Sequence, residues 1–169
     1  MDSRSFPPLA RHLREAGLDD KDIEILEALQ QDGRMPVSEL GRRIGLSQPA
    51  TSERLKRLEE RGIIAGYGAR LNLPALGLNM TAIIRLKTTH EHIRACLKQF
   101  DELPHIVEVH RVTGDDCFVL KAIVPAPEYL ATIVDAIGRY GAVTTSVVLR
   151  SEPPKPVGRA LMTSPRFGA

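Results

Sequence analysis

The sequence is poor in features that mark several common protein classes. Its 169 residues include only two cysteines, Cys96 and Cys117, with no CxxC pair or Cys/His cluster, so neither a disulfide framework nor a zinc site is indicated. No run approaches the roughly 18–20 apolar residues that a membrane-spanning helix needs. The first residues, MDSRSFPPLARHLREAG, lack the apolar core of a secretion signal. We therefore expect a cytoplasmic protein with reduced thiols and no membrane partner.

A strong excess of one charge is also lacking. The net charge is +2, and 43% hydrophobic and 26% charged residues are typical of a globular protein. The length is sufficient for two small domains. Because the whole chain is nearly neutral, any basic surface for nucleic acid has to be local.

The spacing of apolar residues changes near residue 70. Before it, apolar residues recur at helical spacing, and after it β-branched residues form short extended blocks. We expect helices over LDDKDIEILEALQQDGR, over MPVSELGRRIG and over about 47–61, with Asp19 or Asp20 as the first N-cap and Gly45 in the turn between the last two. A supporting helix followed by two short helices and a tight turn is a helix-turn-helix.

From residue 79 the elements follow the order βαββαβ, which is the ferredoxin-like plan. The expected fold class is α+β, with an N-terminal helix-turn-helix (winged-helix-like) domain and a C-terminal ferredoxin-like domain. The tail is Pro-rich and expected to be loosely ordered beyond about residue 155. The expected divisions are an N-terminal extension at 1–17, the helix-turn-helix at 18–66, a linker strand at 67–78, the βαββαβ domain at 79–152 and the tail at 153–169.

The helix at 47–61 is either a solvated surface helix or a DNA-binding one. At about 100° per residue, Thr51, Leu55 and Leu58 face the core. On the first interpretation, Arg54 and Arg57 only pair with nearby glutamates one helical turn away. Residues 34–61, however, hold seven basic side chains against four acidic ones, namely Arg34, Arg42, Arg43, Arg54, Lys56, Arg57 and Arg61 against Glu39, Glu53, Glu59 and Glu60.

The second helix of a helix-turn-helix, with small polar residues at its exposed N-terminus and basic ones behind them, has the layout for entering a major groove. Double-stranded DNA is therefore the expected partner. Ser47 is the expected cap of this helix, with Pro49 in its exposed first turn. The residues expected to face base edges are Gln48, Ser52, Glu53 and Lys56, and those expected to hold phosphates are Arg34, Arg42, Arg43 and Arg57.

Three stretches resemble the Lrp/AsnC family of transcriptional regulators over about residues 18–150. They are LDDKDIEILEALQQDGR, ELGRRIGLSQPATSERLKRLEERGIIAGY, and HRVTGDDCFVL followed by VTTSVVL. The resemblance implies a helix-turn-helix at about 35–54 joined to a C-terminal domain for ligand sensing and oligomerisation. It implies homodimers that commonly assemble into an octamer, and a small-molecule effector that is usually an amino acid, with no other cofactor.

The resemblance places the effector in a cleft between neighbouring C-terminal domains, lined by the turn after the second strand and by part of the last strand. Two positions depart from the family pattern: Thr51 replaces a commoner aliphatic residue, and Cys117 stands where the family turn, Gly-Asp-x-Asp, has its second aspartate. A thiol is a poor acceptor for an α-ammonium group. From its residues alone, the turn is better explained as hairpin chemistry, because Gly and Asp are favoured turn residues. The implied effector residues are Gly114, Asp115, Asp116, Cys117, Thr145 and Ser146.

No catalytic or metal-binding set is indicated. His90 and His92 do not share a helix face, Asp115 and Asp116 are adjacent and point differently, and Cys117 beside two carboxylates is not activated. We therefore expect no enzyme but a sequence-specific DNA-binding transcriptional regulator, modulated by an amino acid or related metabolite. The alternatives are a ligand-independent, nucleoid-type architectural DNA-binding protein, and a metabolite-binding or enzymatic C-terminal domain with a vestigial helix-turn-helix.

Overall fold

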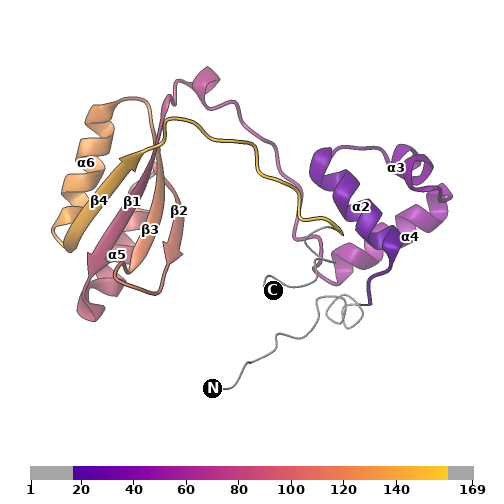
Figure 1. The fold of residues 1–169 in the computed structure, drawn as a ribbon, viewed down its shortest axis with the longest axis horizontal. Helices are drawn as coiled ribbons and strands as arrows, with labels where there is room; N and C mark the ends of the chain where they lie inside the picture. Colours follow the sequence, from indigo (N-terminus) through magenta and orange to yellow (C-terminus); the bar gives the residue numbers. More distant parts are fainter. Residues whose placement is uncertain (1–16, 160–169) are drawn as a thin grey trace, which may run out of the picture. The chain divides into compact units, whose positions relative to one another are not determined.

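The computed structural model describes residues 17–159 and divides into two compact units (Figure 1). The first, called the helical unit, contains the described residues up to Ala69 and those from Pro153 onward. The second, called the sheet unit, is Arg70–Glu152. The expected N-terminal extension, apart from its last residue, and the end of the tail lie outside the described residues.

Three helices form the helical unit: α2 (Asp20–Gln31), α3 (Val37–Ile44) and α4 (Gln48–Glu60). The expected N-cap of α2 is found at Asp19, whose carboxylate accepts the Asp22 N–H at 3.0 Å while the Asp22 carboxylate accepts the Asp19 N–H at 3.2 Å. Gly45 ends α3 in the left-handed conformation, with φ 71°, which a glycine adopts without strain. The predicted helix-turn-helix is therefore confirmed.

The core of the helical unit is built from one apolar face of each helix. Ile25, Leu40 and Leu58 are fully buried in it. Ile63 and Ile64, just after α4, pack against the same core. Burial of these side chains stabilises the unit by the hydrophobic effect, at roughly 1.5–3 kcal/mol for each large side chain.

The segment after α4 differs from the linker strand that we expected over 67–78. No strand forms there; a short 3-10 helix, η1 (Pro74–Leu76), lies within it. A strand needs a neighbour for its backbone hydrogen bonds, and within the described residues this segment has no strand beside it. Pro74 also lacks the N–H that a sheet ladder requires. The start of the segment is held differently, because the Tyr67 hydroxyl donates to Glu59 at 2.8 Å.

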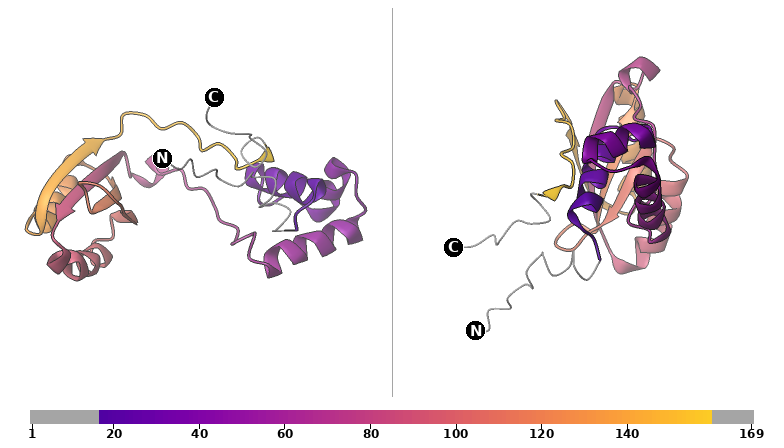
Figure 2. Two further views of the ribbon diagram at one scale, coloured as in Figure 1. Left: turned by 60° about the horizontal axis from the view of Figure 1, so that its bottom comes forward. Right: turned by 90° about the vertical axis from the view of Figure 1, so that its right-hand side faces the viewer.

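The sheet unit is a four-stranded antiparallel sheet with helices on one face (Figure 2). Its spatial order, β2-β3-β1-β4, is that of the expected ferredoxin-like fold. Alternate side chains of β1, Ala82, Ile84 and Leu86, are fully buried and share one core with both helices. The elements are β1 (Met80–Thr88), η2 (His90–His92), α5 (Ile93–Asp101), β2 (Ile106–Arg111), β3 (Phe118–Val124), α6 (Pro127–Gly138) and β4 (Gly141–Val147).

Candidate functional site

The outward face of α4 carries the side chains that the sequence assigns to DNA. Gln48, Ser52 and Lys56 are spaced four residues apart, form one row on this helix, and are exposed. Ser47 caps the helix, its hydroxyl accepting the Ala50 N–H at 3.4 Å. The other predicted residues of this face, Pro49, Glu53 and Arg57, are exposed as well.

The opposite side of α4 is fixed against α3. Thr51 is fully buried, and its hydroxyl donates to the Ser47 carbonyl at 2.9 Å, so its polar group is satisfied. A β-carbon on Gly41 would lie 2.9 Å from both the Leu46 carbonyl oxygen and the Thr51 hydroxyl. The glycine therefore permits α3 and α4 to approach closely at the buried Thr51.

A buried carboxylate on α2 binds two arginines of α4. Asp22 is fully buried, and Arg54 Nη1 donates to its Oδ1 at 2.9 Å. Arg57 Nη2 donates to both oxygens of Asp22 at 3.0 Å. Arg54 Nη1 also binds Asp19 at 2.7 Å; burial raises the pKa of Asp19, but this hydrogen bond and charge outweigh it and leave the pKa below its usual value.

These pairs correct the interpretation in which Arg54 and Arg57 bind glutamates of their own helix. No local pattern in the sequence points to partners more than 30 residues along the chain. On α4 itself, Lys56 and Glu60 form a loose pair at 3.6 Å between two well-exposed side chains. Such a surface pair is worth at most about 0.5 kcal/mol, so Lys56 is available to a ligand.

The remaining predicted basic residues are exposed on α3 and on the loop before it. Arg42 and Arg43 lie in the last turn of α3. Arg43 Nη2 donates to Gln31 Oε1 at 2.8 Å, which orients its guanidinium group. Arg34 is exposed in the loop after α2, where its backbone N–H donates to Asp32 at 2.9 Å.

The turn between β2 and β3 holds four of the predicted effector residues. Gly114 and Asp115 are exposed, whereas Asp116 and Cys117 are partly buried. The Cys117 thiol lies 3.1 Å from the Thr88 carbonyl oxygen and donates to it. Cys117 is thus directed at β1 and packs against the core of the sheet unit.

The two predicted effector residues on β4 do not join this turn within one chain. Thr145 pairs with Ile84 and Ser146 with Ile83, so their side chains point to opposite faces of the sheet. The turn leads into β3, which lies on the other side of β1. Two strand spacings, about 10 Å, therefore separate β3 from β4.

Two further properties bear on function. Within residues 17–159, no group of three His, Cys, Asp or Glu side chains is placed to hold a metal ion. No helix in this part of the chain is long and apolar enough to cross a membrane.

Comparison with known families matches both units. The AsnC-type helix-turn-helix domain matches residues 18–59, and the Lrp/AsnC ligand binding domain matches residues 81–156. An uncharacterized HTH-type transcriptional regulator, YezC of Bacillus subtilis, is 36% identical over 135 residues, covering 79% of this chain and 95% of YezC. The HTH-type transcriptional regulator FL11 of Pyrococcus furiosus is 36% identical over 136 residues, covering 79% of this chain and 90% of FL11.

Solved structures agree with these matches. LrpC of Bacillus subtilis superposes with a TM-score of 0.76 at 30% identity, covering 82% of this chain and 99% of LrpC. The transcriptional regulator NMB0573 of Neisseria meningitidis, solved as a complex with L-Met, superposes with a TM-score of 0.75 at 27% identity, covering 83% of this chain and 95% of its own. With the helix-turn-helix and the ligand-binding domain both matched, the chain belongs to the Lrp/AsnC family and is a DNA-binding transcriptional regulator.

Proposed function

We propose that this regulator reads specific DNA sites with the outward face of α4, and that an amino acid or related small metabolite modulates its DNA binding or assembly. The observation that carries the proposal is the exposed row of Gln48, Ser52 and Lys56 on a helix whose other side is locked into the core. A helix fixed in this way presents its polar side chains to a groove with little loss of entropy. No catalytic reaction is part of this proposal.

The predicted DNA-binding residues fall into two groups, those that contact base edges and those that contact phosphates. Gln48, Ser52, Glu53 and Lys56 hydrogen-bond base edges, and Ser47 and Pro49 shape the N-terminus of α4, whose free N–H groups and dipole favour a phosphate. Phosphates are contacted by arginines outside that row, which are Arg34, Arg42, Arg43 and Arg57. Arg57 binds Asp22 through one nitrogen, and its side chain is 47% exposed, so the rest of its guanidinium group can reach a phosphate in a fixed orientation.

The proposed effector site needs two subunits. Thr145 and Ser146 point to opposite faces of the sheet, and β1 lies between their strand and β3, into which the turn at 114–117 leads. This separation within one chain supports a cleft that a neighbouring C-terminal domain completes. The α-ammonium group of an amino acid fits the carboxylates of Asp115 and Asp116. The L-Met complex of NMB0573 supports the same class of ligand.

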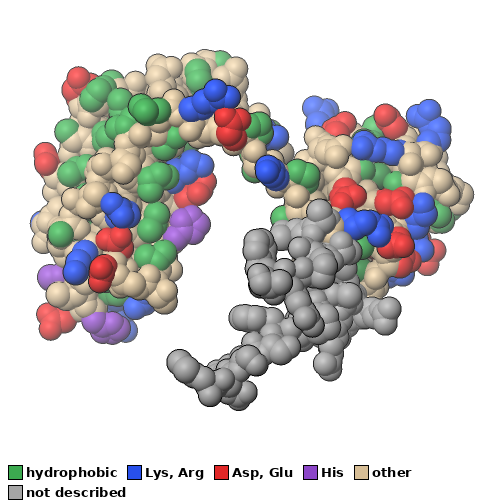
Figure 3. Space-filling model, viewed as in Figure 1, with side chains coloured by type: hydrophobic (Ala, Val, Ile, Leu, Met, Phe, Trp, Pro, Cys, Tyr) green, Lys and Arg blue, Asp and Glu red, His purple; other side chains and the backbone are tan. Residues whose placement is uncertain are grey.

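A second copy of the chain is the proposed partner of the sheet unit, as a homodimer that can assemble further into an octamer. The sheet face away from the helices includes Ile83 and Val119, which are only partly buried, and Figure 3 shows hydrophobic side chains among charged ones on this unit. In such a dimer two copies of α4 read half-sites about 34–36 Å apart. We place the protein in the cytoplasm, at the nucleoid.

The alternative is a ligand-independent, nucleoid-type architectural protein. One observation favours it: position 117, where the family pattern has its second aspartate, carries a thiol that is directed at the Thr88 carbonyl. Under this alternative the sheet unit serves only in assembly.

The DNA-binding part is tested with Lys56→Ala and a matched control. Lys98, on α5, is also exposed and also forms a loose pair four residues along, with Glu102 at 3.9 Å. Lys56→Ala should weaken binding to an operator fragment and, because Lys56 is assigned to base edges, reduce the preference for that fragment over unrelated DNA. Lys98→Ala should change neither quantity. Equal behaviour of the two variants would remove Lys56 from the DNA interface.

The effector part is tested by thermal shift of the full chain against the twenty amino acids. A ligand at a hundredfold excess over Kd stabilises the folded state by about 2.7 kcal/mol. Stabilisation by one amino acid, together with altered operator affinity, supports the amino-acid response. No stabilisation by any of them, with DNA binding intact, favours the architectural alternative.

A further inference from the structure

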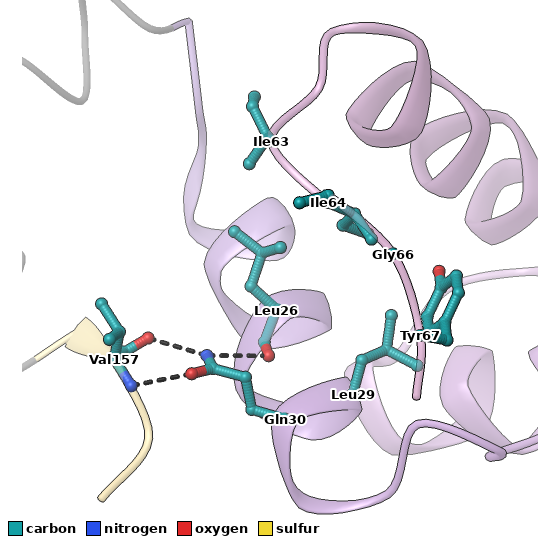
Figure 4. A pocket seen from close by; sticks show the side chains of 9 residues that line it. Leu26, Leu29, Gln30, Ile63, Ile64, Gly66, Tyr67 and Val157 are labelled. Atoms are coloured by element: carbon teal, nitrogen blue, oxygen red, sulfur yellow. Dashed lines mark hydrogen bonds between the residues drawn. The ribbon is translucent and has the colours of Figure 1, made fainter. Parts of the chain in front are cut away.

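The segment after β4 returns to the helical unit and binds α2 there. The side-chain amide of Gln30 on α2 bonds Val157 twice, as Figure 4 shows. Its Nε2 donates to the Val157 carbonyl at 2.8 Å, and its Oε1 accepts the Val157 N–H at 2.8 Å. Both backbone groups of one tail residue are therefore satisfied by one side chain, in the manner of a strand partner.

Two acidic side chains of α2 bind the next part of the tail. Glu27 Oε1 accepts the Arg159 N–H at 2.6 Å, and Asp20 Oδ1 accepts from Arg159 Nη1 at 2.8 Å. Asp20, Glu27 and Gln30 are spaced seven and three residues apart, so they lie on one face of α2. This face receives the tail along nearly three turns of the helix, from Asp20 to Gln30.

Gly158, between the two bonded tail residues, permits this contact. A β-carbon at this position would lie 2.4 Å from Glu27 Oε1. Any other residue would therefore displace the Glu27 carboxylate from the Arg159 N–H.

An apolar groove of about 320 Å³ lies beside these hydrogen bonds (Figure 4). It is bordered by α2, by the segment after α4 and by the tail, and the Val157 side chain at its edge remains 49% exposed. The hydrogen bonds, rather than deep burial, thus fix the tail. The apolar and aromatic side chains lining the groove are Leu26, Leu29, Ile63, Ile64, Tyr67 and Val157.

We propose that this face of α2, with the groove beside it, is a docking surface for the chain's own C-terminal segment, residues 155–159, and that this segment is a structural part of the DNA-binding unit. The occupant is identified by the four hydrogen bonds that residues 157–159 make with Asp20, Glu27 and Gln30. The helical unit then has two connections to the sheet unit, the linker after α4 and the tail after β4.

If the proposed effector site is correct, the tail connects that site to α2; this inference rests on the proposed function. Ser146, in the proposed effector site, precedes Val157 by eleven residues of a single chain segment. A change in β4 on effector binding is therefore transmitted to α2 through the tail. The linker, in contrast, joins the DNA-binding unit after α4.

The docking is tested by amide hydrogen exchange of the full chain, without effector or DNA. The Val157 and Arg159 N–H groups should be protected in the wild type, and Gln30→Ala should speed exchange of the Val157 N–H at least tenfold, because it removes both the acceptor of that N–H and the donor to the Val157 carbonyl. Gln31→Ala is the matched control, since the Gln31 side chain binds Arg43 and makes no hydrogen bond with residues 157–159. Gly158→Ala should likewise speed exchange of the Arg159 N–H. Gly68→Ala, whose added β-carbon has no atom within 4 Å, should leave that exchange unchanged. Equal exchange of the Val157 N–H in wild type and Gln30→Ala would overturn the proposal.

A mixing experiment identifies whose tail is bound. Gln30→Ala chains are mixed with chains lacking residues 153–169, so that the only chains with a tail lack the Gln30 side chain, and their tail can find that side chain only on the other chain. Val157 exchange that stays fast in the mixture supports docking within one chain. Return of wild-type protection would overturn that assignment and identify the tail of a second copy. The exchange and mixing experiments contain no effector. A failure of the tail docking can therefore be distinguished from a failure of the proposed effector site.

Discussion

Arg57 on α4 donates from one nitrogen to both carboxylate oxygens of Asp22 on α2, each at 3.0 Å, and Asp22 is fully buried. The DNA-binding helix is therefore attached to its supporting helix by charge as well as by apolar packing. Arg54 Nη1 binds the same carboxylate at 2.9 Å, so Asp22 holds two neighbouring turns of α4.

Removing the charge of Asp22 should destabilise the helical unit. We expect Asp22→Asn to lower the free energy of unfolding by about 1–3 kcal/mol, because the arginines lose charged hydrogen bonds and the amide nitrogen faces donors. Urea unfolding followed by circular dichroism measures this. Asp135→Asn, at an exposed position of α6, is the control and should stay within about 0.5 kcal/mol of wild type. A similar small effect at Asp22 would mean that the buried charge contributes nothing to stability.

Two substitutions of Arg57 separate attachment from DNA contact. Arg57→Lys keeps the charge but loses the guanidinium geometry, so we expect lower thermal stability with an unchanged salt dependence of operator binding. Arg57→Ala should lower stability and also reduce the salt slope by about one. Fluorescence anisotropy titrations at several salt concentrations give the slopes. Identical slopes for Arg57→Ala and wild type would assign Arg57 to attachment alone.

Local patterns were sufficient to predict the helix-turn-helix. Asp19 before an apolar-periodic run predicted the start of α2, and Gly45 predicted the turn before α4. The buried positions Thr51 and Leu58 followed from helical spacing. Each of these features depends on residues within one or two turns of one another, and such short-range relations are what a sequence displays.

Contacts between distant residues could not be predicted in the same way. Spacing along α4 offered only glutamates of the same helix as ion-pair partners for Arg57, whereas the actual partner, Asp22, lies 35 residues earlier. The direction of the Cys117 thiol depends on where β1 ends. The Pro-rich composition of the tail indicated loose structure, yet Gln30 binds Val157 across 127 residues. These pairings follow from the packed fold.

Restoring an aspartate at Cys117 should cost stability. The thiol donates to the Thr88 carbonyl at 3.1 Å, so a carboxylate there would place two acceptors against each other. We expect Cys117→Asp to lower the free energy of unfolding by about 1–3 kcal/mol and Cys117→Ser, which keeps a donor, to have a smaller effect. Thermal unfolding of both variants decides this. An unchanged or raised stability of Cys117→Asp would show that the turn accepts the family pattern.

The hydroxyl of Tyr67 should titrate unusually late. Burial, and then the hydrogen bond and charge of Glu59, raise the pKa of Tyr67 to about 12, from an ordinary value of 10.0. Because the folded pKa lies above the unfolded one, this contribution to stability is fully present below about pH 10 and is lost as the pH rises through about 12.

Absorbance at 295 nm follows the titration of tyrosine, and Tyr67→Phe should remove a transition near pH 12. Glu59→Gln should lower the pKa of Tyr67, since the charge that disfavours the phenolate is gone, but burial should keep the pKa above its ordinary value. Glu60→Gln, an exposed neighbour whose partner is Lys56, should leave the transition in place. An unchanged titration curve in Tyr67→Phe would show that the Tyr67–Glu59 contact, which fixes the start of the linker on α4, does not persist in solution.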